Sequence, residues 1–195
     1  MGRKLKLAQD KIRFQKTRGL CKGKILHLGA SDNGADYDLH RFLKEKHKVV
    51  VSVDLQEADI IQDLNDLKWE ILEKYDTVLA GEVIEHIHNP TTFVKNCVEL
   101  LRPGGRLIIS TPNATSLIYL YNPNWCVNYE GNSYEEDEGH IHTFTIGMLK
   151  FLMKKQGIEK IDYEYLNGYL GNPLGYFICW MFPRLRGDIM IWGDK

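Results

Sequence analysis

The stretch KILHLGASDNG, residues 24–34, joins a short apolar run to a run of very small residues. The apolar part, Lys24 to Leu28, is typical of a buried strand, and this strand ends abruptly at Gly29. A turn of small residues lets backbone atoms approach a ligand closely, and the N-terminus of a following helix presents N–H groups that favour an anion. The stretch therefore predicts a strand, a ligand-binding turn and a helix in succession.

Predicted strands and helices alternate along the rest of the chain, after a leading amphipathic helix at residues 5–18. Apolar, β-branched runs predict strands at residues 24–28, 48–55, 58–64, 75–81, 105–112, 158–165 and 188–192. Helical spacing predicts helices at residues 37–46, 90–101 and 146–156. Because strands this apolar are buried on both faces, we expect a Rossmann-like α/β fold: a seven-stranded, mostly parallel sheet with helices on both faces, in a single domain.

The composition is that of an ordinary globular domain, with 44% hydrophobic and 26% charged residues among 195. The formal net charge is -1, but Lys and Arg gather in residues 1–24 and acids in residues 129–140. This pattern indicates either two solvated surfaces or a basic strip that meets an anionic substrate. The four cysteines are scattered without a C-x-x-C pair, so reduced thiols and a cytoplasmic location are expected. The apolar run at residues 174–183 is too short to span a bilayer.

A lone acid, Asp54, ends the second predicted strand, twenty residues after Gly34. A carboxylate at this place can accept hydrogen bonds from ribose hydroxyls, so the two features together predict an adenosine-containing cofactor. Gly29, Ser31 and Gly34 keep the register of a loose dinucleotide-binding fingerprint. An NAD-dependent oxidoreductase and a non-catalytic nucleotide-binding protein are therefore alternatives, although little chain remains after residue 112 for a separate substrate domain.

Five ordered blocks of the chain resemble the class I S-adenosylmethionine-dependent methyltransferases. The branch that includes ubiquinone-biosynthesis O-methyltransferases and small-molecule and glycan methyltransferases is the most similar. The blocks are ILHLGASDNG, VVSVDL, YDTVLAGEVIEHIHNP, LLRPGGRLIISTPN and HIHTFT, within residues 24–157. The resemblance implies transfer of a methyl group from S-adenosylmethionine to a hydroxyl or amine of a small-molecule or glycan acceptor, with S-adenosylhomocysteine as product. Nucleic acid is not the expected partner.

The same resemblance assigns cofactor-binding roles to residues after the strand ends. It implies that the methionyl part meets Gly29, Ser31 and Gly34, the ribose Asp54, the adenine Asp63 and Leu64, and the sulfonium region Gly81 and Glu82. His27 stands where the family has an acid, and Ser31 where it has a glycine. We therefore expect the contacts to the methionyl amino group to be rearranged.

Histidines are the candidate general bases. A methyl group on a positively charged sulfur is already activated, so the protein mainly has to align the acceptor. A hydroxyl acceptor also needs a base, and imidazole takes a proton near neutral pH. The candidates are His86, His88, His140 and His142. We expect His86 and His142 to be catalytic, because both belong to blocks that the resemblance places around the cofactor.

A metal-dependent reaction is an alternative that uses the same segment. On a helix starting near Glu82, Glu85 and His86 would lie on the same face as Glu82. Joined by His142, they could hold a divalent cation that activates a hydroxyl, an arrangement that resembles the small-RNA 2'-O-methyltransferases. We nevertheless expect no metal site, because the sequence EVIEH also occurs in the wider family without metal.

The domain organisation is expected to comprise an N-terminal amphipathic helix at residues 1–23 and an S-adenosylmethionine-binding methyltransferase domain at residues 24–195. A substrate cover is expected at residues 113–142, because its aromatic rings offer stacking surfaces for a sugar, a quinone or a base. The late aromatic run GYFICWMFP, residues 175–183, is expected in the core. An exposed edge that meets a lipid-like substrate is the alternative.

Overall fold

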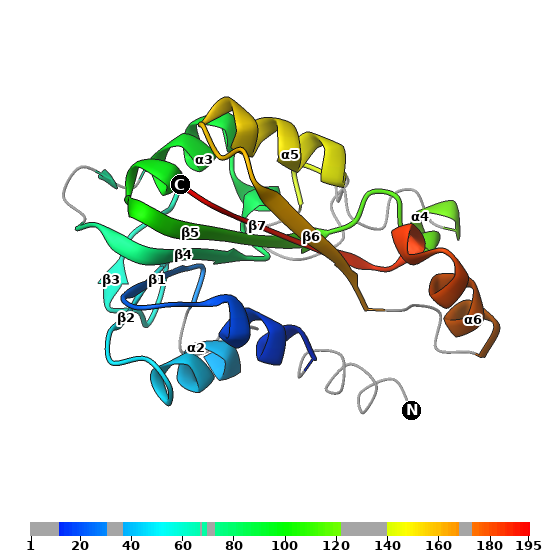
Figure 1. Cartoon of the computed structure of the whole chain (residues 1–195), viewed down its shortest axis with the longest axis horizontal. Coiled ribbons are helices and arrows are strands. Elements are labelled where there is room, and N and C mark those ends of the chain that lie inside the picture. Colours follow the sequence, from blue (N-terminus) through cyan, green and yellow to red (C-terminus); the bar gives the residue numbers. More distant parts are fainter. Residues whose placement is uncertain (1–11, 31–36, 67, 70–72, 122–139, 168–172) are drawn as a thin grey trace.

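A seven-stranded sheet forms the centre of the molecule, in the order β3-β2-β1-β4-β5-β7-β6 (Figure 1). The computed structural model describes residues 12–30, 37–66, 68–69, 73–121, 140–167 and 173–195. The strands are β1 (Ile25–Leu28), β2 (Val50–Asp54), β3 (Ile60–Ile61), β4 (Tyr75–Gly81), β5 (Leu101–Pro112), β6 (Ile161–Leu166) and β7 (Asp188–Asp194). Neighbours among β1 to β5 are parallel, and β7 is antiparallel to both β5 and β6. The predicted fold, a mostly parallel Rossmann-like sheet in a single domain, is confirmed.

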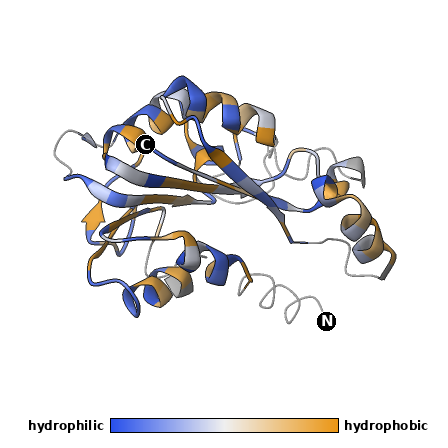
Figure 2. Cartoon of the chain, viewed as in Figure 1, coloured by the Kyte–Doolittle hydropathy of each residue, from blue (hydrophilic) through white to orange (hydrophobic). Residues whose placement is uncertain are grey.

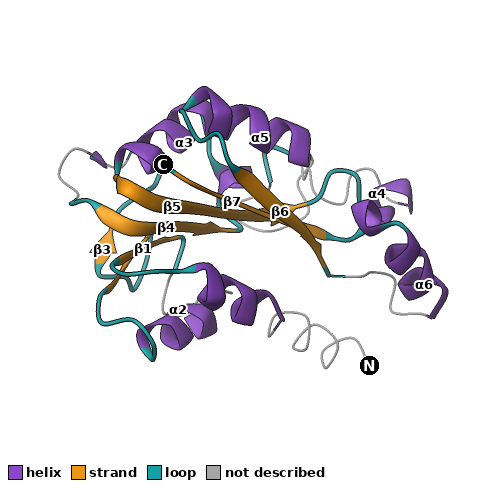
Figure 3. Ribbon diagram, viewed as in Figure 1, coloured by secondary structure: helices purple, strands orange, loops and turns teal. Residues whose placement is uncertain are grey.

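Helices cover both faces of this sheet (Figures 1 and 3). The α-helices are α2 (Tyr37–Lys44), α3 (Pro90–Glu99), α4 (Leu117–Tyr121), α5 (Ile146–Lys155) and α6 (Pro173–Met181), and the short 3-10 helices are η2 (Ile84–His86) and η3 (Pro183–Leu185). Helices α3 and α5 lie over one face, and α2 lies over the other with a helix at residues 12–20. Within the described part of the chain, no helix combines the length and the apolar character that crossing a membrane requires.

Consecutive residues of a central strand enter opposite sides of the core. In β4, Val78 and Ala80 pack with Phe93 of α3, whereas Leu79 packs with Leu43 of α2. Both sides of the strand are therefore apolar, which explains why it is a continuous hydrophobic run in the sequence rather than an alternating one.

The two helices over the first face begin at side-chain caps. The side chain of Asn89 accepts a hydrogen bond from the Thr92 amide ahead of Pro90, the first residue of α3. Thr145 accepts one from the Met148 amide at the start of α5. These caps satisfy amide groups that the first helical turn leaves unpaired, and they place both starts where the sequence predicts them.

The sequence predicts that the fifth strand begins at Gly105, but β5 begins four residues earlier, at Leu101. The pairing with β4 shifts register between Tyr75 and Thr77, so residues 102–105 form an irregularity within the strand. Gly104 has a φ of 74°, and its amide donates to the Lys195 carbonyl at 2.9 Å. The Pro-Gly-Gly sequence that predicts a turn is thus accommodated as a bulge, because its backbone groups find partners at the C-terminal strand.

The late aromatic residues lie outside the core, so their predicted burial is wrong. Figure 2 shows α6 as an apolar helix set apart from the sheet. The exposed apolar side chains of α6 and the residue after it are Leu174, Tyr176, Phe177, Trp180, Met181 and Phe182. Other helices already cover the central strands of the sheet, and α6 is buried only on the side that carries Gly175 and Cys179. Of the expected substrate cover, residues 122–139 lie outside the described residues.

Gly193 in β7 provides a test of this packing. A Cβ atom there would lie 2.4 Å from Ile158 Cγ2 and 2.8 Å from the Lys160 carbonyl oxygen. Gly193→Ala should therefore lower the free energy of unfolding by about 1–3 kcal/mol, measured by urea denaturation. Gly147→Ala in α5 is the control, because its nearest contact would be at 3.7 Å and alanine favours a helix. A Gly193→Ala variant as stable as the parent would contradict the packing of β7 described here.

Candidate functional site

The carboxyl ends of β1, β2 and β4 lie side by side at one edge of the sheet. Leu28 at the end of β1 pairs with both Val53 and Ala80. The strand order reverses here, since β2 and β3 lie on one side of β1 and β4 and β5 on the other. Ligands of open α/β sheets bind outside the carboxyl ends of the strands at such a reversal. The structure brings four predicted cofactor-binding residues to this edge: Gly29, Asp54, Gly81 and Glu82.

Gly29 forms a tight turn directly after β1. Its φ is 73°, and its amide donates to the Val53 carbonyl at 2.9 Å. A Cβ atom would lie 2.2 Å from Val83 Cγ2, so the chain's own packing requires glycine here. The sequence suggested instead that the missing side chain makes room for a ligand. The other two small residues of the prediction, Ser31 and Gly34, lie outside the described residues.

Asp54 ends β2 with a partly exposed carboxylate. Its Oδ1 accepts a hydrogen bond from the Leu55 amide at 2.6 Å. Its backbone carbonyl accepts one from the Gln62 amide at 2.9 Å, which ties β2 to the turn after β3. Asp54 Oδ2 makes no hydrogen bond to the residues that the structure describes. The carboxylate therefore keeps one oxygen with which to accept a hydrogen bond from a ligand hydroxyl.

The predicted adenine contacts, Asp63 and Leu64, lie in the turn after β3. Asp63 Oδ1 accepts hydrogen bonds from the Asn65 amide at 2.8 Å and from its side chain at 3.3 Å. Asn65 in turn accepts one from the His88 amide at 2.9 Å, which links this turn to the segment after η2. Leu64 is partly buried against the core on the α3 face. The turn is thus fixed at the same edge, and its contact with adenine stays a prediction.

Glu82 follows β4 in an unusual backbone conformation, with a φ of 53°. Its amide donates to the Ser110 carbonyl, and its Oε1 accepts a hydrogen bond from Ser110 Oγ, both at 2.9 Å. The Arg13 guanidinium lies 3.9 Å from the same carboxylate. The prediction of a helix starting near Glu82 is therefore wrong. The left-handed backbone conformation of Glu82 is incompatible with a right-handed helix, and only the short 3-10 helix η2 follows it. Glu82 is directed towards β5 and the N-terminal helix.

Glu85 connects three segments at this edge. It lies in η2 with 1% of its surface exposed, and its Oε2 accepts a hydrogen bond from Thr111 Oγ1 of β5 at 2.8 Å. Its backbone carbonyl accepts the amides of Ile141 and His142 at 2.9 and 3.1 Å. A carboxylate that is buried to this degree needs such partners. Glu85 therefore holds the segment from residue 140 onward against the end of the sheet.

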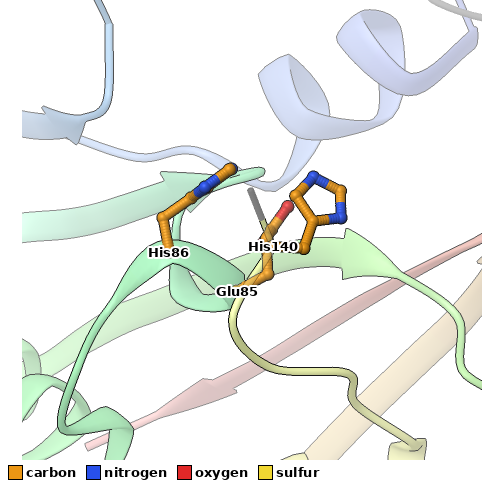
Figure 4. Close-up of side chains that lie close together, drawn as sticks. All are labelled: Glu85, His86 and His140. Atoms are coloured by element: carbon orange, nitrogen blue, oxygen red, sulfur yellow. The ribbon is translucent and has the colours of Figure 1, made fainter. Parts of the chain in front are cut away.

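The side chains of His86 and His140 lie next to each other beside this carboxylate (Figure 4). Their ring centroids are 4.8 Å apart at an interplanar angle of 81°. One ligand atom from each of Glu85, His86 and His140 lies within 4.8 Å of the others. Burial lowers the pKa of His140, which favours the neutral imidazole that accepts a proton or binds a metal.

Of the candidate bases, the structure places the ring of His140, and not that of His142, next to His86. The ring beside His86 is that of His140, whereas the His142 ring lies 6.0 Å from that of Phe144. His140 was already among the four candidate bases, but the spacing of HIH does not separate it from His142, because residues two apart in an extended segment share a face. The roles of His86 and His142 stay predictions.

The partly buried environment of His140 predicts a pH dependence of stability. Because its pKa is lower in the folded protein than the usual 6.5, the unfolded chain takes up the proton first as the pH falls. The free energy of unfolding should therefore fall as the pH drops below about 6.5. His140→Gln should reduce this loss, measured by urea denaturation across the pH range. His88→Gln, at an exposed histidine, is the control, and an unchanged slope in His140→Gln would count against this environment.

Comparison with known proteins finds methyltransferases. The family model of the methyltransferase domain matches residues 33–163. The ubiquinone biosynthesis O-methyltransferase of Cereibacter sphaeroides is 27% identical over 180 residues, which cover 89% of this chain and 66% of that protein. The human mitochondrial ubiquinone biosynthesis O-methyltransferase is 36% identical over 103 residues, 52% of this chain and 28% of that protein. The chain therefore matches less than two thirds of the length of each of these relatives.

Solved structures share the fold at low identity. An S-adenosylmethionine-dependent methyltransferase from Archaeoglobus fulgidus has a TM-score of 0.65 at 16% identity, covering 97% of this chain and 94% of that one. An N-methyltransferase from Bradyrhizobium japonicum in complex with S-adenosylhomocysteine has a TM-score of 0.57 at 11% identity, covering 89% and 78%. Because the family model covers most of the chain, the protein belongs to the methyltransferase-domain family, among the class I S-adenosylmethionine-dependent methyltransferases.

Proposed function

We propose that this chain transfers a methyl group from S-adenosylmethionine to a hydroxyl or amine of a small-molecule or glycan acceptor. The observation that carries the proposal is the placement of Gly29, Asp54 and Glu82 at the reversal of strand order. The relatives named ubiquinone biosynthesis O-methyltransferase favour an oxygen acceptor over a nitrogen acceptor. S-adenosylhomocysteine would be the released product.

The residues present fit the methyl donor. Asp54 offers a carboxylate oxygen to the ribose hydroxyls, because only Oδ1 is engaged by the Leu55 amide. Gly29 lets the Val83 side chain pack directly against the end of β1, which fixes the turn at this edge. Arg13 and Glu82 add opposite charges next to the end of β4. When bound, the donor supplies a methyl group on a positively charged sulfur.

Proton removal from the acceptor is assigned to a histidine at this edge. Methyl transfer to a hydroxyl breaks the carbon–sulfur bond, forms a carbon–oxygen bond and leaves one proton to be removed. His86 and His142 are the proposed bases, one in η2 and the other held next to it by the Glu85 carbonyl. A neutral imidazole nitrogen can take the proton within hydrogen-bond reach of the acceptor.

Calorimetry with S-adenosylhomocysteine and with NAD tests the proposed cofactor. The chain should bind S-adenosylhomocysteine, and Asp54→Ala should weaken this binding by about 10- to 100-fold. The reason is that a hydrogen bond to a charged group contributes roughly 1.5–3 kcal/mol. Asp162→Ala, at an exposed acid on β6, should leave the dissociation constant unchanged. Binding of NAD in place of S-adenosylhomocysteine, or an unaffected Asp54→Ala variant, would contradict the proposal.

A metal-assisted version of the reaction is the second candidate, favoured by the cluster of Glu85, His86 and His140 (Figure 4). One carboxylate and two imidazoles suit several divalent cations. The cluster differs from the set expected from the sequence, because Glu82 is directed towards Ser110 and Arg13 while His140 takes the place given to His142. At this site a bound cation would polarise the acceptor oxygen.

Titration of the full chain with Mn²⁺ alone separates the two versions. If the cluster holds a cation, Glu85→Gln and His140→Gln should each weaken Mn²⁺ binding at least about tenfold, because each removes one of three protein ligands. His142→Gln should bind Mn²⁺ like the parent, since His142 is outside the cluster. Absence of Mn²⁺ binding by the parent would exclude the metal-assisted version and leave the histidine base.

A further inference from the structure

The apolar side chains of α6 form one continuous exposed face. At about 100° per residue, Tyr176, Trp180, Phe177, Met181 and Leu174 follow one another around an arc of about 160°. These side chains are 42% to 71% exposed, with Trp180 the most exposed. The opposite arc carries Gly175 and Cys179, which are buried. The helix therefore has a side that packs on the protein and a side that is fully apolar and open.

Contacts on the inner side hold the helix in place. The Arg186 guanidinium donates to the Cys179 carbonyl at 3.3 Å and to the Tyr165 carbonyl of β6 at 3.0 Å. The Phe182 amide donates to the Ile178 carbonyl at 2.8 Å, and η3 follows directly. The open face is thus presented by an anchored element.

Charged residues are absent from the sequence of this helix and begin again directly after it. The sequence from Tyr165 to Pro183 contains no charged residue. The next residue, Arg184, is exposed. Its carbonyl accepts hydrogen bonds from the side chains of Asn113 and Thr115, which fixes the backbone at this point. A cation is therefore held at the margin of an uncharged apolar face.

We propose that α6 is an interfacial helix that binds the surface of a phospholipid membrane. α6 has no charged face, so its binding would rest on its exposed apolar side chains, which would lie in the headgroup and acyl boundary and gain free energy in proportion to the apolar area buried there. Tyr176 and Trp180 suit this depth, because their rings are apolar and carry one polar group. Arg184 is placed to pair with lipid phosphate groups.

A membrane fits this face better than a second copy of the chain. A helix of nine residues is about 13 Å long and about 10 Å wide, so two crossing helices bury on the order of a few hundred Å². A stable interface needs about 800 Å² from each partner. A rigid partner also meets only the strip of a convex helix that faces it. A bilayer has neither limit, because lipid can surround the whole arc.

Docking through α6 would bring the candidate site to the membrane. Asn113, which holds the Arg184 and Arg186 carbonyls, lies directly after β5, at the same edge of the sheet as Asp54 and Gly81. An acceptor dissolved in the bilayer would then lie on the side of the molecule where the strands end. This last step rests on the proposed function, whereas binding of lipid by α6 does not.

Vesicle co-sedimentation of the full chain tests the proposal. The parent should sediment with vesicles of phosphatidylcholine mixed with phosphatidylglycerol. The double variant Phe177→Ser, Trp180→Ser should bind at least about tenfold more weakly, because it removes two large apolar side chains from the face. Arg184→Gln should lose about fivefold on the anionic vesicles and little on pure phosphatidylcholine, because one basic residue near an anionic surface contributes about 1 kcal/mol.

Phe151→Ser is the matched control, since Phe151 is an aromatic residue of α5 that is 65% exposed and remote from α6 in sequence. It should bind vesicles like the parent. All substituted side chains are exposed, so the variants should keep the parent's urea denaturation curve.

A parent that does not sediment, or a double variant that binds equally well, would overturn the proposal. A parent that forms a dimer but does not bind vesicles, together with a double variant that stays monomeric, would overturn the proposal in favour of a second copy of the chain. Calorimetry with S-adenosylhomocysteine on the same samples reports separately on the proposed function.

Discussion

The parallel pairing of β1 between β2 and β4 is the constraint on which the rest of the structure depends. Leu28 lies opposite both Val53 and Ala80, so three strands end together and the residues after them meet at one edge. A shift of one residue in this register would turn every side chain of β1 to the other face of the sheet. The register is secured because both faces are filled, by α3 and α5 on one side and by α2 and the N-terminal helix on the other. The position of Asp54 relative to Gly29 is therefore set by the core.

The sheet and its functional edge could be predicted from the sequence because they depend on local patterns. Apolar runs that end in Gly29, Asp54 and Gly81 mark strands, and parallel strands place their carboxyl ends together. The prediction failed where local patterns were ambiguous. The apolar run of α6 has the composition of a core segment, and only the full arrangement of the elements shows that just one side of this helix is buried. In the same way, the positive φ of Glu82, stabilised by Ser110 from β5, could not be predicted from helical spacing.

The proximity of His86 and His140 depends on a long-range contact. His86 and His140 are 54 residues apart, and the Glu85 carbonyl brings them together by accepting the amides of Ile141 and His142. The motif EVIEH and the later HIH could be recognised as parts of one site, but the sequence does not show that the ring beside His86 is that of His140, because His140 and His142 are two residues apart and would share a face of an extended segment. The result is a carboxylate and two imidazoles at the end of β4, close to the residues proposed to hold the methyl donor. The same group of side chains could therefore either remove a proton from the acceptor or bind a divalent cation.

The central claim is that the edge formed by β1, β2 and β4 binds the adenosyl part of a methyl donor. A crystal structure of the chain with S-adenosylhomocysteine tests it most directly. The account predicts the ligand over the turn at Gly29, with a ribose hydroxyl donating to the Asp54 carboxylate. A ligand bound elsewhere, or an Asp54 carboxylate with no contact to it, would contradict the account.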